Sequence, residues 1–422
     1  MKKYDAKQQK TSASGNPLNL ILGGVFALLL VWGLFKINPY PAATPAATPI
    51  PAAAQVQAVP ATPDAVPAEE PAIGETPEQP EESAAPAVEK TVYRIPEGQT
   101  APAPNPAAFG CVPVESAAQM EEVYQRAVEY GLLEADETVA FRSDADFNRG
   151  SYYQDIMYYL DETLLVVCWK ELVGGATLTM CEIKIGDGSQ MRMNIWGDIN
   201  NENDNNYLSQ AIAGLNCVVA MNTDKCKARG DGILICDRQI YKYNENPYAG
   251  NLKRYNCLDN CLVTGDGDFL FTYRLEEKTL EEMQQFVADN NVIFSMSFGP
   301  CLIDEGQMRT GYFPGDENYI EYAFGENEKP YSRAGIGQLG TRHYVYCSLN
   351  HSDEMAANWT MRDFAENMYA RGYFRNFYAL DGGQTAELII NDTIYNHIDF
   401  GAERLTSNWL YFCSALPEGA AS

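Results

Sequence analysis

The sequence predicts a sheet-rich domain of the α+β class, because strand-like runs outnumber helix-like segments and the two kinds do not alternate regularly. Strand patterns recur at 164–170, 177–185, 191–196, 217–221, 233–236, 239–243, 261–264, 269–273, 292–297, 342–348, 377–380 and 409–413. Helix patterns occur at 116–130, 207–215, 279–290 and 360–371. We therefore expect a mixed β-sheet domain with few helices, preceded by one transmembrane helix and a disordered linker.

Capping residues set the boundaries of three of these helices. Thr279 and Thr360 each precede an apolar-periodic segment, where a threonine hydroxyl accepts a hydrogen bond from the first turn. Ser116 and Gln119 have the spacing of a capping box, and Gly131 is placed to end that helix. These positions predict helices that begin and end at defined residues.

The first 37 residues predict a membrane anchor. Residues 18–35 carry no charge, and a helix of this length spans about 27 Å, close to the hydrocarbon thickness of a bilayer. Four lysines precede this run, so the positive-inside rule places residues 1–17 in the cytoplasm. We expect an uncleaved signal-anchor at 18–37, with a cleaved signal peptide as the alternative because Ala42 and Ala43 are small.

Residues 38–108 are predicted to form a disordered linker. Of the 23 prolines in the chain, 16 lie between Pro39 and Pro106. This segment has too few apolar residues to offset the entropy of ordering it. Residues 109–422 are long enough to bury a substantial core. We therefore expect a single-pass protein of the cell membrane with an extracytoplasmic domain at 109–422.

Charge and cysteine content limit the partners and the compartment. The chain has 57 acidic and 30 basic residues, a formal net charge of −27, so no nucleic-acid partner is expected. All 11 cysteines follow residue 110, which in an exported protein predicts disulfides and at least one unpaired thiol. Cys226 with Cys236 and Cys257 with Cys261 are local candidates, and the connectivity stays open.

Three patterns that could suggest a cofactor or metal are weak. Gly335, Gly337 and Gly340 match GxGxxG, but an extended segment follows where a dinucleotide site needs a helix. Three histidines and the absence of CxxC spacing disfavour structural zinc. The polar run 198–206 lacks the central glycine of a calcium loop. No cofactor and no metal site are predicted.

The strongest local motif is the run from Ala379 to Thr385, which reads ALDGGQT. A buried strand delivers the Asp381 carboxylate at its end, and Gly382 and Gly383 let the backbone turn and a ligand approach closely. The alternative is an ordinary Asp-Gly turn within a β-hairpin.

Six segments occur together in one order along the chain. They are Asn222 after a strand, Phe298-Gly299-Pro300-Cys301-Leu302, Ser332-Arg333-Ala334-Gly335-Ile336-Gly337, the helix from Thr360, Leu380-Asp381-Gly382-Gly383-Gln384-Thr385, and Glu403-Arg404. This order resembles the phosphodiester glycosidase family, which includes a mammalian enzyme that removes N-acetylglucosamine from a sugar phosphodiester. Each segment alone is weak, and the ordered set is specific.

The chain departs from the family pattern at several positions. Thr223 and Ala334 stand where the family usually has Gly and Thr, and Gln384 replaces the third glycine of its signature. Thr385 replaces a serine and keeps a hydroxyl, and an Asp-Gly common near Asn350 is absent. These differences leave open the alternative of a non-catalytic glycan-binding or envelope-structural module.

The resemblance implies cleavage of a sugar C1–O bond with a phosphate monoester as leaving group. The second pKa of a phosphate monoester is near 6, so this group departs with little proton assistance. The cation-like transition state still needs a carboxylate, and the departing phosphate needs a cation, for which arginine is best. We assign Asp381 to the first role and Arg333 to the second. Glu403 is either a second carboxylate or part of a salt bridge that holds the site.

The other motif positions are assigned to substrate binding: Asn222, Gly299, Gly382, Gly383, Thr385 and Arg404. Together these assignments predict a hydrolase, held at the cell membrane by its N-terminal helix, that acts on sugar-1-phosphodiesters in surface glycans.

Overall fold

The computed structural model describes residues 91–142, 155–173, 176–224, 232–243, 259–273, 278–313, 315–316, 331–350 and 359–419. The predicted tail, anchor and most of the predicted linker lie outside these residues. Within the described ranges, no helix is long and apolar enough to cross a membrane.

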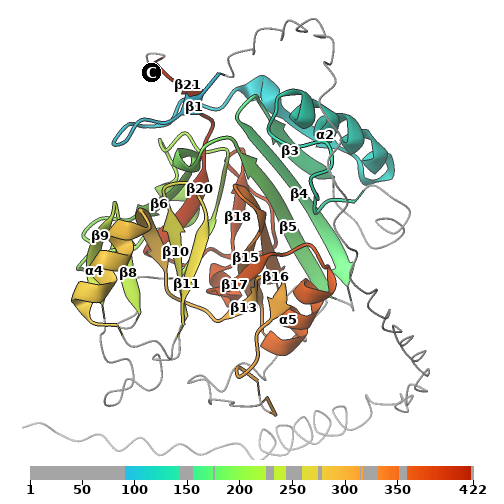
Figure 1. Cartoon of the computed structure of the whole chain (residues 1–422). Coiled ribbons are helices and arrows are strands. Elements are labelled where there is room, and N and C mark those ends of the chain that lie inside the picture. Colours follow the sequence, from blue (N-terminus) through green and yellow to red (C-terminus); the bar gives the residue numbers. More distant parts are fainter. Residues whose placement is uncertain are drawn as a thin grey trace, which may run out of the picture. The chain divides into compact units, whose positions relative to one another are not determined.

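A nine-stranded sheet forms the centre of the domain (Figure 1). Its strands, in spatial order, are β14 (Gln307–Met308), β13 (Cys301–Asp304), β17 (Asn376–Leu380), β15 (Arg333–Gly340), β16 (His343–Asn350), β5 (Ala176–Ile185), β4 (Leu164–Val173), β3 (Ile156–Leu160) and β2 (Phe109–Val112). Every pairing between these neighbours is antiparallel.

Smaller sheets complete the strand content. The five-stranded sheet has the order β19 (Thr393–Ile394), β18 (Leu388–Ile390), β7 (Val219–Asn222), β20 (Asn408–Phe412) and β6 (Met191–Ile195). A three-stranded sheet has the order β11 (Phe269–Thr272), β10 (Asn260–Thr264) and β12 (Val292–Met296). Two further pairs are β8 (Ile233–Cys236) with β9 (Gln239–Tyr243), and β1 (Tyr93–Arg94) with β21 (Leu416–Pro417).

Helices are few and short in the described residues. The α-helices are α2 (Met120–Glu129), α3 (Leu208–Ala211), α4 (Leu280–Asp289) and α5 (Met361–Ala370). Short 3-10 turns lie at Pro106–Ala108, Val114–Gln119, Gly188–Gln190, Gly383–Thr385 and Asp399–Gly401. The structure is therefore sheet-dominated with few helices, as the sequence predicted.

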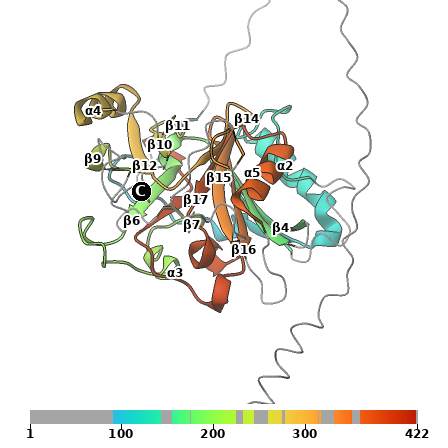
Figure 2. The ribbon, with the colours of Figure 1, turned by 90° about the horizontal axis from the view of Figure 1, so that it is seen from below.

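Apolar layers cover both faces of the nine-stranded sheet. Along β4, Leu165, Val167 and Trp169 join the cluster that includes α2 and α5, while Leu164 and Val166 join the opposite one. Helices α2 and α5 lie on the same side of the sheet (Figure 2). The opposite cluster lies between the nine-stranded sheet and the five- and three-stranded sheets. Both faces being apolar explains the nearly continuous hydrophobic run of β4.

Two of the three predicted capping patterns are confirmed. Thr279 and Thr360 cap α4 and α5, each with a complete capping box. The Ser116 cap is wrong, because Ser116 lies inside a 3-10 turn that begins after Pro113. Pro113 has no side-chain acceptor that could cap the turn, and Ser116 N donates instead to the Pro113 carbonyl at 2.8 Å.

The ordered domain begins earlier than the predicted boundary at Phe109. Strand β1 pairs with β21, and Ile95 and Ala101 are buried in the same apolar cluster as Trp409. The backbone N–H of Ile95 also donates to Ser189 Oγ at 2.9 Å. These few apolar contacts hold a proline-rich segment that composition alone assigns to the linker.

None of the nine described cysteines forms a disulfide. Cys226 and Cys257, the partners in the two predicted local pairs, lie outside the described residues, while Cys236 and Cys261 are free. Most of the described cysteines are buried and fill space as small apolar side chains. Cys168 and Cys181 are directly opposed across β4 and β5.

A buried charged cluster lies beneath α2. The Glu182 carboxylate accepts hydrogen bonds from Ala140 N at 2.8 Å, Phe141 N at 3.2 Å and Tyr124 Oη at 2.5 Å. His343 Nε2 lies 2.8 Å from Glu182 Oε1, and His343 Nδ1 lies 2.9 Å from Glu137 Oε1. This cluster joins the segment after α2 to the nine-stranded sheet.

Candidate active site

The predicted site lies where the two large sheets meet. Strand β17 ends at Leu380 and delivers Asp381, while Arg333 begins the neighbouring strand β15. The register pairs Ala334 with Leu380, which places Arg333 beside Asp381. Asn222 ends strand β7 of the five-stranded sheet. Residues that are up to 159 positions apart in sequence therefore meet at one point.

Backbone hydrogen bonds fix the Asp381 loop from both sides. Asp381 N donates to Thr223 O at 2.9 Å, and Asn222 Nδ2 donates to Asp381 O at 2.6 Å. On the other side, Gly383 N donates to Ser332 O at 3.1 Å. The main chain of Asp381 is thus held independently of its carboxylate.

The two glycines of the loop have separate structural reasons. A Cβ on Gly382 would lie 2.3 Å from Ser332 O, so only glycine permits this approach. Gly383 has φ of +67°, a conformation that other residues rarely adopt. The hairpin interpretation of this motif is wrong, because β17 and the following β18 belong to different sheets.

The two principal charged residues differ in exposure. Arg333 is 8% exposed, and its guanidinium carbon lies 5.6 Å from the centre of the Tyr331 ring. Asp381 is partly exposed, whereas Leu380 before it is buried. A largely desolvated guanidinium beside a carboxylate can stabilise an anionic group of a ligand more strongly than an exposed one.

Two residues predicted to bind substrate support the loop. Asn222 is 2% exposed, and its Oδ1 accepts from Tyr346 Oη at 2.7 Å. Thr385 is also 2% exposed, and its hydroxyl donates to Gly382 O at 2.7 Å. Their buried side chains therefore help to hold the Asp381 loop in place through hydrogen bonds.

Gly299 lies beside β17 on the side away from β15. Its N–H donates to Ala379 O at 3.2 Å, and Ala379 N donates to Pro300 O at 3.0 Å. These bonds bring the Gly-Pro segment to the end of the strand that carries Asp381.

Glu403 and Arg404 differ in how firmly the structure holds their side chains. The Glu403 carboxylate accepts from Ser209 N at 3.0 Å and from Ser209 Oγ at 2.6 Å. Within the described part of the chain Glu403 forms no ion pair, so the salt-bridge alternative finds no support there. Arg404 is exposed. Gln384 Nε2 donates to Ala402 O at 2.8 Å, which ties this loop to the Asp381 loop.

Sequence reasoning missed Glu387, a buried carboxyl group directly before β18. Glu387 is 2% exposed, and its backbone N–H donates to Asn222 Oδ1 at 3.4 Å. Burial, together with the charge and hydrogen bond of Glu403, raises the pKa of Glu387 to about 9. The available signal was a single carboxylate inside the apolar run 386–390.

Asp224 is a second missed carboxylate near the site. It is 1% exposed and accepts from Ser297 N at 2.5 Å and from Asn408 Nδ2 at 2.6 Å. These bonds join the end of β7 to the start of β20 and to the segment before Gly299. Its position indicates a role in holding three site segments together.

No group of three potential metal-ligating side chains is assembled within the described residues. The site as described offers carboxylates, a guanidinium and backbone amides. Such a set suits a sugar with an attached anionic group, because carboxylates stabilise positive charge and arginine binds phosphate oxygens in pairs.

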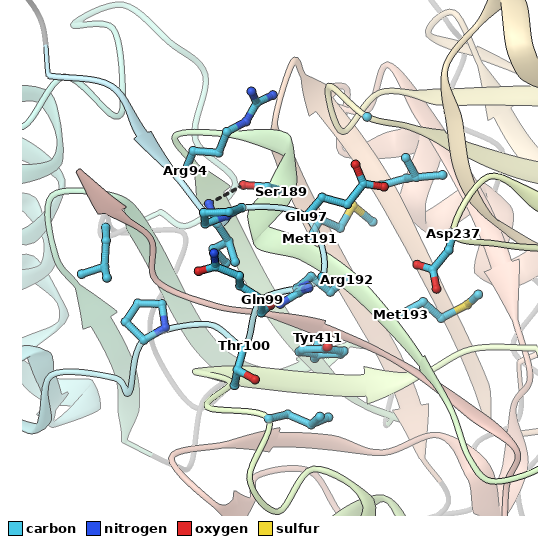
Figure 3. A pocket seen from close by; sticks show the side chains of 18 of the residues that line it. Arg94, Glu97, Gln99, Thr100, Ser189, Met191, Arg192, Met193, Asp237 and Tyr411 are labelled. Carbon is cyan, nitrogen blue, oxygen red and sulfur yellow. Dashed lines mark hydrogen bonds between the residues drawn. The ribbon is translucent and has the colours of Figure 1, made fainter. Parts of the chain in front are cut away.

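A cavity of about 1050 Å³ lies elsewhere in the domain (Figure 3). Its lining includes Arg192, Tyr411, residues 94–100 and Pro102, and none of the nine predicted site residues. Its arginines are engaged by this segment: Arg192 Nη1 donates to Gln99 O at 2.8 Å, and Arg238 Nη1 lies 2.6 Å from Glu97 Oε1. The cavity is therefore separate from the Asp381 loop.

Comparison with known proteins gives one family match. The family described as phosphodiester glycosidase matches residues 209–413, a range that includes all nine predicted site residues. No curated protein matches the sequence.

Several solved structures are similar at low identity. A zebrafish N-acetylglucosamine-1-phosphodiester alpha-N-acetylglucosaminidase catalytic domain, auto-inhibited by its pro-peptide, is 13% identical with a TM-score of 0.43, covering 60% of this chain and 83% of its own. A hypothetical protein from Synechocystis is 11% identical with a TM-score of 0.40, covering 59% and 62%. A putative exported protein from Burkholderia pseudomallei is 9% identical with a TM-score of 0.33, covering 56% and 74%.

Proposed function

We propose that this chain hydrolyses the sugar C1–O bond of sugar-1-phosphodiesters, because residues 209–413 match the phosphodiester glycosidase family. The observation that carries this proposal is the register of β15 and β17. It sets Arg333 beside Asp381 at the ends of two paired strands, with the Gly382 backbone packed against Ser332. A carboxylate and a desolvated guanidinium side by side match the two charges of the transition state.

The proposed reaction separates charge at C1 and at the phosphate. The C1–O bond breaks, its electron pair leaves with the phosphate monoester, and positive charge develops on the sugar ring. Asp381 stabilises that charge or activates the incoming water, and Arg333 binds the departing phosphate oxygens. Water supplies the new oxygen on C1 and releases one proton. The leaving phosphate needs little protonation.

The test is incubation of the full chain with a panel of sugar-1-phosphodiesters, scoring free reducing sugar. Release of sugar from at least one member in water enriched in oxygen-18, with the label on the sugar and not on the phosphate, supports cleavage of the C1–O bond. The matching phosphomonoesters serve as controls, since their cleavage would indicate a phosphatase instead.

We further propose that the substrate is a surface glycan and that residues 18–37 hold the domain at the cell membrane. The uncharged run 18–35 and the lysines before it support this location. A reporter that functions only outside the cytoplasm is expected to be active when it is fused after Glu89. Inactivity of that reporter would contradict the orientation.

Arg333→Lys is expected to lower turnover by about 10-fold or more. Lysine keeps the charge but loses the planar pair of N–H donors, and one charged hydrogen bond contributes about 1.5–3 kcal/mol. Steady-state kinetics on a cleaved phosphodiester measures the loss. Arg375→Lys, at an exposed arginine paired with Glu305, is the matched control and should keep full turnover. Equal kinetics for both variants would make Arg333 structural.

A non-catalytic glycan-binding module is the second candidate. The observation in its favour is that the side chains of Asn222 and Thr385 make hydrogen bonds within the protein. In that case the chain would bind the phosphodiester panel without releasing sugar, which equilibrium binding measured beside the hydrolysis assay distinguishes.

A further inference from the structure

The short turn Asp399–Gly401 carries the most exposed large apolar side chain in the described part of the chain. Phe400 is 85% exposed, and the next most exposed such residue is Val92 at 55%. Ile398 and Asp399, the two residues before it, are both buried. The base of the turn is therefore packed into the domain while the phenyl ring at its tip lies in solvent. An aromatic ring in water is unfavourable, because its apolar surface stays hydrated.

The backbone of Phe400 has a conformation that phenylalanine rarely adopts. Its φ is +64° and its ψ is +11°, which is the left-handed region. Within the described ranges, every other non-glycine residue with positive φ is polar or charged: Asn216, Asp237, Arg238, Asn291, Glu305, Arg342, Asn391 and Asp392. Glycine would adopt this conformation without strain. A strained backbone that holds an apolar ring in solvent indicates a role in binding rather than in stability.

Two hydrogen bonds hold the turn beside the candidate active site. Ser332 Oγ donates to Asp399 Oδ2 at 2.6 Å, and Ser332 is the residue directly before strand β15. On the other side of the exposed ring, Gln384 Nε2 of the Asp381 loop donates to Ala402 O at 2.8 Å. The segment 399–402 is thus tied to the two segments that carry the proposed arginine and carboxylate.

We propose that Phe400 is an aromatic platform, whose exposed ring packs against a sugar unit of the substrate while that substrate occupies the Asp381 loop. A pyranose ring presents a face of C–H groups. Covering this face with the phenyl ring removes apolar surface of both partners from water. The identity of the ligand as a sugar phosphodiester rests on the proposed function.

A lipid surface is the other partner that an exposed phenyl ring could meet. The formal net charge of −27 opposes approach to anionic headgroups. The hydrogen bonds of Ser332 and Gln384 also place the turn at the candidate site, where a sugar is expected. These two observations favour the sugar as the partner.

The first experiment measures the affinity of the full chain for the panel of sugar-1-phosphodiesters by calorimetry. Both proteins carry Asp381→Asn, so that the ligand stays intact, and they differ only at Phe400→Gly. Loss of the ring should weaken binding by about 10-fold, because the apolar face of the sugar is then left in water. Equal affinities, or no binding of any panel member, would overturn the proposal.

Two control variants in the same background separate this effect from unrelated ones. Tyr130→Ala removes another exposed aromatic side chain, which lies at the end of α2. Asp392→Gly introduces a glycine at another exposed residue with positive φ, in the turn between β18 and β19. Both controls should keep the affinity of the parent protein. A loss in either control as large as that of Phe400→Gly would overturn the assignment.

Thermal unfolding of Phe400→Gly tests the strain. The variant should raise the Tm by about 2 °C, because glycine adopts positive φ freely and an 85% exposed side chain contributes little packing. A gain in stability together with a loss of affinity is a result that a packing role does not produce. A lower Tm with unchanged affinity would make Phe400 a packing residue.

Phe400→Trp covers the case in which Phe400→Gly does not fold. An indole ring keeps a flat apolar face, so this variant should bind the panel with nearly the parent affinity. Its fluorescence, compared with that of the parent protein, should shift to shorter wavelength when a panel ligand covers the ring. No shift at saturating ligand would overturn the proposal. A shift with phosphatidylcholine vesicles alone would assign the ring to a membrane instead.

The platform and the proposed hydrolysis can fail separately. Binding that depends on Phe400, with no sugar released by the wild type, would remove the proposed function and leave the platform. Release of sugar with the same KM in the wild type and in Phe400→Gly would remove the platform and leave the proposed function.

Discussion

Asp381→Asn is expected to lower hydrolysis of sugar-1-phosphodiesters by at least about 100-fold, on the order of 3 kcal/mol of transition-state stabilisation. Asparagine is nearly isosteric and removes only the negative charge that the cation-like sugar needs. The backbone N–H and C=O of Asp381, which bond to Thr223 and Asn222, are unaffected. The melting temperature should therefore stay close to that of the wild type. The measurements are kcat/KM and Tm on the same preparation.

Thr385→Val provides the matched comparison for Asp381→Asn. It removes the hydroxyl that donates to Gly382 O at 2.7 Å and leaves that partly buried carbonyl without this partner. This variant should lose stability by about 1 kcal/mol or more while keeping the Asp381 charge. A stable and fully active Asp381→Asn protein would falsify the assignment of Asp381.

Glu182→Gln is expected to lower the free energy of unfolding by about 3 kcal/mol or more. The Glu182 carboxylate accepts from two backbone amides, from Tyr124 and from His343, and it is fully buried. A glutamine amide would direct one N–H group at these donors and remove the counter-charge of the histidine. Urea unfolding gives the change directly.

Glu305→Gln is the control for Glu182→Gln. The Glu305 ion pair with Arg375 is exposed, and such pairs contribute at most about 1 kcal/mol. Equal losses for the two variants would mean that burial adds nothing to the Glu182 cluster.

The same cluster gives a pH window of stability. Burial raises the pKa of Glu137, but hydrogen bonds from His343 and Lys184 outweigh it and lower the pKa to about 2. Burial lowers the pKa of His343, but its bonds to Glu137 and Glu182 outweigh it and raise that pKa above 6.5. The Glu137 contribution is present above 4.5 and is lost as pH falls toward 2. The His343 contribution is complete below 6.5 and is lost as pH rises through the raised pKa. Glu182→Gln should therefore lower the pH at which the His343 contribution to stability is lost.

Local patterns predicted many elements of the fold closely. The bounds of β8 and β9 are those expected from the sequence, and Thr279 and Thr360 cap the helices that they were predicted to cap. These elements succeed because their signals are contained in a few neighbouring residues. Gly131 and Gly372 end helices with positive φ for the same reason.

Strand β15 shows where local patterns fail. Its glycines matched GxGxxG and gave no strand signal. A Cβ on Gly335 would lie 2.5 Å from the Phe377 ring, and one on Gly337 would lie 2.5 Å from the Phe374 ring. The two glycines make room for one aromatic side chain of β17 and one from the segment just before it. That requirement comes from tertiary packing, which the sequence of β15 alone does not contain.

The candidate site was predictable in part. Asp381 and Arg333 stood out because glycines and an ordered family pattern surround them. Glu387 did not, because its burial and the nearby charge of Glu403 arise only in the folded chain. The sequence identified Asn222 and Thr385 as site residues but did not predict their buried hydrogen bonds. Burial at the end of a strand depends on which other segments pack over it.

The two carboxylates proposed for the site come from segments of two different sheets. Asp381 belongs to the nine-stranded sheet and Glu403 to a loop of the five-stranded sheet, with an apolar layer that includes Leu388 between the sheets. The thickness of this layer sets how far apart the two carboxylates stand. In glycosidases that distance separates retention from inversion of configuration. Under the proposed function, with Asp381 and Glu403 as the two carboxylates, the volume of the apolar side chains between the sheets would therefore influence which anomer is released.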